Sequence, residues 1–291
     1  MPERRRAIRR SSRRPSPGRG SRGNRPARSP WLGARWDEPT QNERLRTAYE
    51  AGLIDYVEVN YPLMPGGSPD VSPTAPILVH CPINPIASVH GFNRALARQV
   101  RAAAIEHGSP WIGEHLCWAG PGPEGRLGYI VNPLFCDAVR DAAIENARAL
   151  TAFYGRPIAL ELAPVYDSTG TFDSEVHFLA SVARAADTHV IFDLAHWTAS
   201  NRNLRRPADF GLDVLEPERI VELHLAGIRS GRSGRFWHDS HGDVPEEELL
   251  ELTAHLARRL PRLAAVTFEH AEDAPEADFM RTLERLRRVL G

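Results

Sequence analysis

Residues of metal-ligand type recur at the ends of apolar runs in this chain. The run IVELHLAG contains His224, the segment WHDSHGDVP then offers Asp239 and His241, and the next apolar run, VTFEHAED, contains Glu269. Imidazoles and carboxylates without thiolates are the usual ligands of catalytic iron, manganese or zinc. The pattern predicts a metalloenzyme.

Eight short apolar runs, which alternate with helix-like segments from Trp31 onward, must position these residues. The runs lie at 31–36, 55–61, 76–83, 111–118, 157–164, 189–196, 219–227 and 264–272. Most are rich in Val, Ile, Leu or Ala at consecutive positions, which is typical of strands buried on both faces of a parallel sheet. They predict an α/β fold, a (β/α)8 TIM barrel formed as a single domain by residues 31–291. A doubly wound open sheet is the alternative, but no GxGxxG fingerprint follows the first strand.

Helical periodicity fills most of the gaps between these runs. We expect helices at 41–51, 92–107, 135–154, 174–186, 246–260 and 276–290, and a shorter one within 203–217. The gap at 62–76 is rich in Pro and Gly and is predicted to be a loop.

The active site of such a barrel is built at the carboxyl ends of the strands and in the loops that follow them. We expect the polar residues at the late strand positions, and those of the loop after the seventh strand, to meet there. They are Glu58, Asn60, His80, Glu114, His115, Glu161, Asp193, His196, His224, Asp239, His241 and Glu269. One ion cannot use so many ligands, so two or three ions that share bridging carboxylates fit the set better.

Some of these residues have a second interpretation. Glu114 and His115 are neighbours in a strand, so only one of them should face the barrel interior. We favour His115 as a ligand, with Glu114 as a ligand or a supporting carboxylate. His196 is a weaker candidate, because HWTASNRN could begin a loop. For Glu161 and Glu269, each in an apolar strand, the alternative to metal ligation is a buried arginine partner.

The other histidines and the cysteines receive no role. We expect surface or core positions for His90, His107, His177, His189, His238, His255 and His270. Cys81 and Cys117 lie beside candidate ligands, but such cysteines are more often small buried hydrophobic residues.

Charge is divided between two opposed blocks. Residues 1–28 contain eleven Arg and one Glu, a charge of +10, which leaves −11 on the remainder. The segment 1–30 has little to bury and is predicted to be a disordered basic tail, either a solvated extension or the product of an overextended start site. It has no aromatic residue to stack on bases, so nucleic acid is not an expected partner. Three scattered cysteines, no apolar stretch of about 20 residues and no secretory signal favour a cytoplasmic protein without membrane contact.

Seven motifs, in order along the chain, resemble those of the DUF692 family. These proteins are multinuclear non-heme iron-dependent oxidases that modify ribosomally made peptides, and they include the methanobactin biosynthesis oxidase. The motifs are LVHCPINPIAS, GEHLCW, LELAPVY, FDLAHWTASN, ELHLAG, DSHGDVP and FEHAED. The resemblance extends from about Gly33 to the C-terminus and also implies a (β/α)8 barrel.

The resemblance implies a ligand set and an activity. The implied iron ligands are His80, His115, Glu161, Asp193, His224, Asp239, His241 and Glu269. The implied reaction uses O2 at two or three iron ions to oxidise a residue of a precursor peptide, most often Cys and sometimes Asp or Asn. A separate protein that captures the leader part of the precursor is the expected partner.

The chain departs from the family pattern at several positions. Cys81 replaces the Gly of an LHG motif, Ala195 and His196 stand where the family often has two Asn, and Ile228 follows HLAG where many members have another His. The second strand, VEVNYP, is shorter than the family pattern, so Glu58 and Asn60 are not matched to family positions. These differences indicate a divergent subfamily with an altered substrate pocket.

Two other classes of function remain open at this point. A xylose-isomerase-like barrel, either a sugar isomerase or epimerase or an endonuclease-IV-like phosphodiesterase, would place similar residues at the strand ends. Arg35, Arg202 and Arg229 could then bind phosphate, although the barrel region is acidic. A non-catalytic barrel that only holds a peptide is the third hypothesis.

Overall fold

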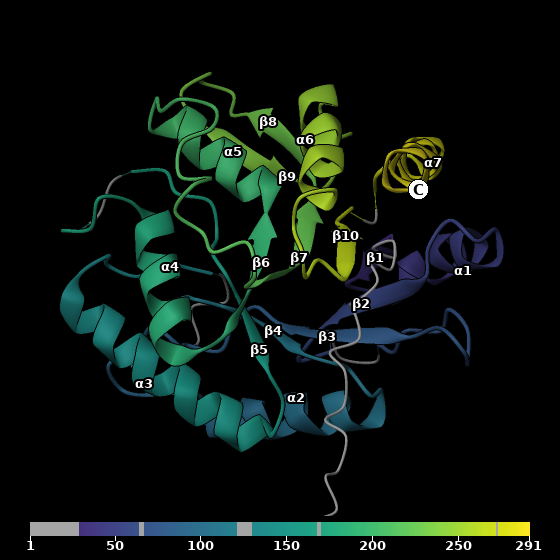
Figure 1. Cartoon of the computed structure of the whole chain (residues 1–291). Coiled ribbons are helices and arrows are strands. Elements are labelled where there is room, and N and C mark those ends of the chain that lie inside the picture. The colour runs from purple at the N-terminus through teal and green to yellow at the C-terminus, as the bar shows by residue number, and fades with distance from the viewer. Residues whose placement is uncertain (1–28, 64–66, 121–129, 168–169, 272) are drawn as a thin grey trace, which may run out of the picture.

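A computed structural model describes residues 29–63, 67–120, 130–167, 170–271 and 273–291, and within it eight parallel strands close into a barrel with helices around the outside (Figure 1). Around the barrel the order is β1, β10, β7, β6, β5, β4, β3 and β2. The strands are β1 (Trp31–Trp36), β2 (Tyr56–Asn60), β3 (Ile77–Cys81), β4 (Ile112–His115), β5 (Ile158–Glu161), β6 (His189–Asp193), β7 (Ile220–Leu225) and β10 (Ala265–Phe268). The predicted TIM barrel is confirmed.

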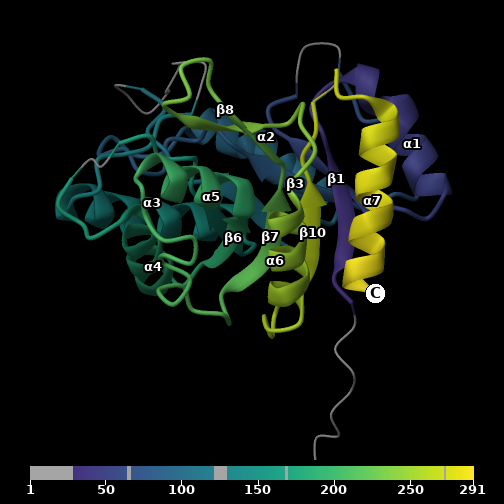
Figure 2. The ribbon, with the colours of Figure 1, turned by 90° about the horizontal axis from the view of Figure 1, so that it is seen from above.

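The two ends of the described chain close the barrel. Strand β1 pairs with both β2 and β10 in parallel register, for example Gly33 with Tyr56 and with Thr267. Outside this seam, α1 (Asn42–Glu50) and α7 (Glu276–Leu290) lie side by side (Figure 2). Arg287 of α7 contacts the segment between α1 and β2, since it donates to the Leu53 carbonyl at 2.9 Å and pairs with Asp55 at 2.8 Å.

Helices cover the outer face of the sheet and bury its outward-pointing side chains. Besides α1 and α7 they are η1 (Pro39–Gln41), α2 (Arg94–Glu106), α3 (Asp137–Tyr154), α4 (Glu175–Ala186), α5 (Leu194–Asn203) and α6 (Glu247–Ala257). Capping residues mark several helix ends. Asn93 accepts from two backbone amides at the start of α2, and Gly155 ends α3 in the left-handed conformation. Within the described ranges, no helix has both the length and the apolarity needed to cross a membrane.

The barrel interior is divided into an apolar layer and a polar layer. Tyr56, Leu78 and Ala265 form a small buried cluster, against which Trp111 packs. The polar layer lies toward the carboxyl ends of the strands, where the candidate ligands are found. Outward-facing residues such as Trp36 instead belong to the large core between strands and helices.

The structure corrects three sequence-based expectations. Strand six was predicted to run to residue 196, but β6 ends at Asp193 and α5 begins at Leu194, so His196 lies in a helix and does not begin a loop. No helix occupies the described residues 204–217, because the helical segment lies earlier, in α5. The predicted basic tail lies almost entirely outside the described residues.

The third correction concerns the segment after strand seven. This segment was predicted to be a loop, but it is an antiparallel hairpin of β8 (Gly227–Ser230) and β9 (Trp237–Ser240). In Figure 2, β8 crosses above the barrel strands. Asp239 therefore lies in a paired strand opposite Ile228, with His241 directly after that strand.

Candidate metal centre

Eleven of the twelve sequence-predicted residues gather at the carboxyl end of the barrel. Their atoms form overlapping groups, each with three ligand atoms within 4.8 Å of one another. These groups are the first, His80–His115–Glu161, the second, Asp193–His224–Glu269, the third, Asp239–His241–Glu269, and two that overlap them, Glu161–Asp193–His196 and Glu58–Glu222–His224. Asn60 lies next to the first group, while Glu114 lies apart.

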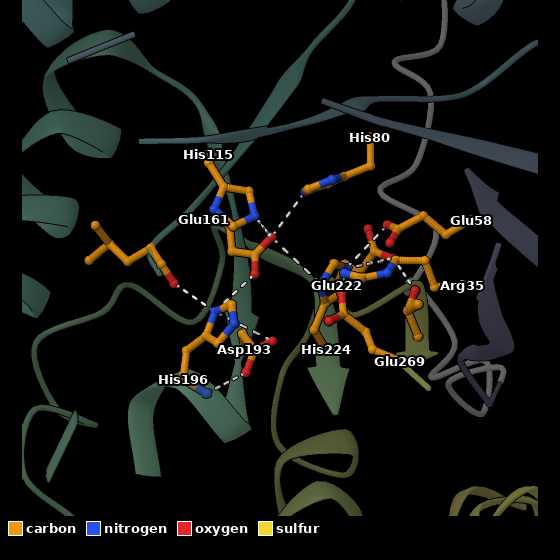
Figure 3. A network of polar contacts seen from close by, with 12 residues as sticks. Arg35, Glu58, His80, His115, Glu161, Asp193, His196, Glu222, His224 and Glu269 are labelled. Atoms are coloured by element: carbon orange, nitrogen blue, oxygen red, sulfur yellow. Dashed lines mark hydrogen bonds and ion pairs between the residues drawn. The ribbon is translucent and has the colours of Figure 1, made fainter. Parts of the chain in front are cut away.

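The first group joins three neighbouring strands. The Nε2 atoms of His80 and His115 lie 3.0 and 3.1 Å from the same carboxylate oxygen, Oε2 of Glu161 (Figure 3). On the other side of the His80 ring, Nδ1 lies 2.8 Å from Oδ1 of Asn60. The amide oxygen can only accept, so His80 carries its proton on Nδ1 and leaves Nε2 free for a cation.

Gly113 creates the space for the His80 ring. A Cβ atom at this position would lie 2.2 Å from Cδ2 of His80. The register explains the contact, since His80 of β3 pairs with Gly113 of β4. A residue without a side chain is therefore required beside this candidate ligand.

The second group combines β6, β7 and the residue that follows β10. Nδ1 of His224 lies 2.9 Å from Oε1 of Glu269, and Asp193 completes the group. The opposite ring nitrogen, Nε2, lies 3.2 Å from Oε2 of Glu58 and 3.5 Å from Oε1 of Glu222. These carboxylates accept the Nε2 proton, which leaves Nδ1 as the ligand atom, so the Glu58–Glu222 pair supports the ring.

The hairpin supplies most of the third group. Nε2 of His241 lies 2.7 Å from Oδ2 of Asp239 and 2.9 Å from Oε2 of Glu269. Glu269 thus directs one oxygen to the second group and the other to the third. That bridging position suits a carboxylate shared by two ions.

His196 faces the centre from the first turn of α5. Asp193 begins this helix by accepting from the His196 amide at 2.6 Å, which orients the ring toward Glu161. Nδ1 of His196 lies 2.8 Å from the Leu162 carbonyl and 3.2 Å from Oε1 of Glu161. Its Nε2 lies 3.6 Å from Oδ2 of Asp239, so this ring spans the first and third groups.

Many buried atoms of the centre have no hydrogen-bond partner despite close neighbours. The atoms are Glu58 Oε1, Glu161 Oε1, Asp193 Oδ2, His224 Nδ1, Asp239 Oδ1, His241 Nε2 and Glu269 Oε2. Unpaired polar atoms are costly to bury, and here they face one another from several strands. The residues present therefore fit divalent cations that carboxylates and imidazoles can ligate.

The charges of the centre favour the same interpretation. Burial raises the pKa of the Asp193 carboxyl to about 7, and the negative charges of Glu269 and Glu161 add to the rise. Burial also opposes the charge of Glu161, but His115 and His224 hold its pKa well below its ordinary value. A cation among these carboxylates would remove their mutual repulsion.

Glu222 is a buried site residue that the sequence interpretation missed. Its carboxylate accepts from Thr267 Oγ1 at 2.6 Å, Trp111 Nε1 at 2.9 Å and Tyr56 OH at 3.3 Å. A signal was present, because residues two apart in a strand face the same side, and Glu222 precedes His224 by two.

Glu114 does not join the centre. It points outward from β4, where its Oε1 accepts from Tyr154 OH of α3 at 2.5 Å. Burial raises the pKa of Glu114 to about 8. His115 faces the centre and Glu114 faces away from it, which agrees with the expectation that only one of the two points inward. This geometry does not support a role for Glu114 as a ligand or as a supporting carboxylate.

Arg35 at the end of β1 completes the wall of the centre. Its NH1 pairs with Oε1 of Glu269 at 2.6 Å, and its NH2 lies 2.7 Å from Nδ1 of His241. The sequence left a buried arginine partner as the alternative to metal ligation for Glu269. Arg35 is such a partner. The same carboxylate also contacts two imidazoles, so the arginine contact alone does not explain its surroundings.

A cavity of about 670 Å³ opens beside the centre. Its lining includes Val131, Pro164 and Tyr166, together with His196 and Asp239 of the centre.

The model of one protein family, described as the RiPP precursor modification enzymes MbnB/TglH/ChrH, matches residues 66–290 of this chain. The chain belongs to this family. The DUF692 resemblance is thereby confirmed, and a precursor peptide is the substrate that the family implies. The eight residues that the resemblance implied as iron ligands all lie in the groups at the carboxyl end of the barrel.

Curated relatives of this family member include several proteins named UPF0276. One from Anaeromyxobacter sp. (strain Fw109-5) is 27% identical over 223 residues, which cover 73% of this chain and 77% of the relative. Another, from Streptomyces avermitilis, is 30% identical over 206 residues, 68% of this chain and 41% of the relative.

Solved structures share the fold at low identity. A xylose isomerase-like TIM barrel protein from Mycobacterium smegmatis, in complex with magnesium, is 15% identical with a TM-score of 0.57, covering 89% of this chain and 96% of that one. Endonuclease IV from Thermus thermophilus is also 15% identical, with a TM-score of 0.51 and coverage of 89% and 99%. These likenesses establish the barrel architecture alone.

Proposed function

We propose that the chain is a multinuclear non-heme iron-dependent oxidase that uses O2 to modify one residue of a ribosomally synthesised precursor peptide. The observation that carries the proposal is the set of inward-facing imidazoles and carboxylates whose buried atoms lack hydrogen-bond partners. Family membership supplies the substrate class. Iron fits a mixed nitrogen and oxygen ligand set and can also accept a substrate thiolate.

The residues of the centre divide into two roles under this proposal. The ligands would be the eight residues carried over from the family, namely His80, His115, Glu161, Asp193, His224, Asp239, His241 and Glu269. His196 is a ninth candidate, because its ring faces Glu161 and Asp239. Asn60, Glu58 and Glu222 would orient the ligand imidazoles. Bound iron would supply the redox chemistry with O2.

The cavity beside His196 and Asp239 is the proposed entry for the peptide residue. We propose Cys as the modified residue, with Asp or Asn as alternatives. The apolar walls would exclude water from the reacting groups, while the buried centre holds them in fixed positions. A separate protein that binds the leader part of the precursor is the proposed partner.

The test begins with the metal. Protein purified without oxygen should contain two or three irons per chain and show a mixed-valence Mössbauer signal that O2 changes. Precursor peptides should then be modified with consumption of O2. Zinc or manganese without any O2 response would refute the oxidase proposal, and no metal at all would refute any metalloenzyme.

A matched pair of variants tests whether Glu161 or Glu114 binds the metal. Glu161→Gln should lose both metal and turnover, because Glu161 faces two imidazoles. Glu114→Gln should keep the metal content of the parent chain, because this equally buried side chain points away from the centre. Equal metal loss in both variants would contradict the assignment.

The isomerase and nuclease alternatives have less support. Arg202 pairs with Glu246 at 2.5 Å and Arg229 with Asp243 at 2.6 Å, so both have carboxylate partners, as Arg35 does. A phosphate ligand would have to displace these contacts. Tight binding of abasic DNA, or turnover of a ketose, would favour these alternatives over the oxidase.

The non-catalytic alternative makes a different prediction. A barrel that only holds a peptide should keep full function when His224 or Glu269 is replaced by Ala. The oxidase proposal predicts that either change abolishes metal loading and turnover, since both side chains lie in the second group.

A further inference from the structure

The cavity beside the centre has an apolar lining that metal binding does not explain. Its volume of about 670 Å³ lies within the range of pockets that enclose small ligands, roughly 300–1,000 Å³. A space of this size can hold the modified residue together with a neighbouring residue of the peptide. The apolar residues of the lining come from two segments, 130–132 and 163–167, and are Ile130, Val131, Ala163, Pro164, Val165 and Tyr166.

Segment 163–166 forms one wall of the cavity, and side chains of this chain already engage its backbone. The carbonyls of Ala163 and Pro164 accept from Nδ2 of Asn132 at 3.3 and 2.9 Å. Proline also has no amide hydrogen to donate. These backbone groups are therefore not available to pair with an added peptide strand, the mode of recognition in which main-chain hydrogen bonds supply the affinity.

One face of α5 holds the rest of this wall. Ser200 and Asn203 follow His196 by four and seven positions, so the three side chains point to the same side of the helix. Ser200 Oγ accepts from the Val165 amide at 2.8 Å, and Asn203 Nδ2 donates to the Val165 carbonyl at 3.1 Å. Asn203 also donates to the carbonyl of Trp237 in β9 and accepts from its amide. A single helix thus fixes the wall, the hairpin and the centre relative to one another.

Tyr166 lies where the wall meets solvent, since it lines the cavity and is 40% exposed. Its hydroxyl lies 3.1 Å from Nδ1 of His238. Its ring centroid lies 5.3 Å from that of His238 and 6.1 Å from that of Phe236. These two hairpin residues hold the tyrosine ring in place. A fixed and partly exposed aromatic ring offers a large contact area to a ligand at a low cost in side-chain entropy.

The acidic groups of the lining disfavour an acidic ligand at this wall. Asp167 and Asp239 line the cavity, and none of its described lining residues is Arg or Lys. An acidic peptide side chain held against the wall would lose its hydration without gaining such a partner. An apolar side chain would instead bury its surface against Val131, Pro164 and Tyr166.

Resting on the proposed function, we propose that this wall is a subsite for an apolar side chain next to the modified residue of the precursor peptide, with Tyr166 as the specificity-determining residue. The modified residue then faces His196 and Asp239, while its neighbour packs against Pro164 and Tyr166. This preference belongs to the wall and is independent of the number and identity of the bound ions.

Short capped peptides test the preference. The probes are acetyl-X-Cys-X-amide, with X as Leu, Gln, Asp or Arg, and the same residue on both sides of Cys covers either direction of the peptide. In calorimetric titration of the iron-loaded chain without oxygen, the Leu peptide should bind about 10-fold more tightly than the Gln peptide, because a leucine side chain becomes buried. The Asp peptide should bind most weakly. A second series with Asn or Asp in place of Cys covers the alternative modified residues.

The ratio of the Leu and Gln affinities separates specificity from folding, because a damaged fold weakens both peptides together. Tyr166→Ala should reduce this ratio to about threefold or less, and Tyr166→Phe should preserve it, since the ring remains. Tyr49→Ala is the matched control. This tyrosine of α1 is partly buried and does not line the cavity, so the ratio should equal that of the parent chain.

Three results would overturn the subsite: no binding of any peptide or equal affinities for the Leu and Asp peptides, a preference for Arg, or an unchanged ratio in Tyr166→Ala. Failure of the proposed function is distinguishable, because the metal-free full chain should keep the Leu preference in saturation-transfer NMR with the same peptides. That preference in a chain that retains no iron would refute the oxidase and support the subsite. Iron and peptide oxidation without the preference would support the oxidase and refute the subsite.

Discussion

Glu222 and His224 lie two residues apart on β7, with Oε1 of the carboxylate 3.5 Å from Nε2 of the imidazole. Three donors on three other strands or loops hold this carboxylate, namely the side chains of Tyr56, Trp111 and Thr267. The apolar floor of the barrel is thus connected to the candidate metal centre through one fully buried glutamate.

Replacing Glu222 by Gln should weaken metal retention by about 10- to 100-fold, because the supporting charge behind the His224 ring is lost. Competition with a coloured chelator measures the change in affinity. Trp111→Phe is the matched control: it removes one donor to Glu222 but leaves the charge, so its effect should be smaller. Equal affinity in Glu222→Gln and the parent chain would leave Glu222 with a packing role only.

Replacing Asp193 by Asn should have opposite effects on the metal-free and metal-loaded protein. The pKa of Asp193 rises from 3.8 to about 7 in the fold, so its stabilising contribution is complete below pH 3.8 and is lost as the pH rises through 7. At pH 8 the neutral amide should stabilise the metal-free chain by about 1–3 kcal/mol, a gain that shrinks toward pH 5. Metal retention should be lost.

Chemical denaturation at pH 5 and pH 8 checks the first effect, and ion counting checks the second. Asp187→Asn is the control, because the side chain of Asp187 is 92% exposed. A loss of stability in metal-free Asp193→Asn at pH 8 would show that the ionised carboxylate is not a liability in the empty centre.

Metal uptake should release protons near neutral pH. Burial raises the pKa of Asp193 to about 7; burial and Arg35 lower that of His241, but Asp239 and Glu269 outweigh them and raise it to about 9. Both groups must lose a proton before they can ligate, so affinity should increase between about pH 6 and pH 9. Calorimetric titration with Zn²⁺ in two buffers of different ionisation enthalpy measures the protons released. A buffer-independent heat would argue against ligation by either residue.

Gly113→Ala and Gly33→Ala should separate metal retention from stability. A Cβ at position 113 would lie 2.2 Å from the His80 ring, and one at position 33 would lie 2.3 Å from the Tyr56 ring. Each change should destabilise the fold by about 1–3 kcal/mol. Only Gly113→Ala should also release an ion from the first group. Thermal unfolding of the metal-free chains and ion counting distinguish the two effects, and equal ion loss in both variants would contradict this placement of His80.

Much of the candidate centre could be predicted from the sequence. Each of His80, His115, Glu161, Asp193, His224 and Glu269 ends or directly follows an apolar run, and parallel strands in a closed barrel bring such ends together. The eight apolar runs were therefore enough to predict that these residues meet at one end of the barrel. Alternation along a strand also separated His115 from Glu114.

Only the tertiary structure decided how these residues are supported. His196 faces the centre because Asp193 begins a helix at that point, and Asp239 is directed by a hairpin that local pattern did not distinguish from a loop. The roles of Arg35 and Glu222 depend on contacts with residues more than 160 positions away. A strand pattern specifies which side a residue faces, but not which partner meets each ring nitrogen, because that depends on the register of strands paired around the barrel.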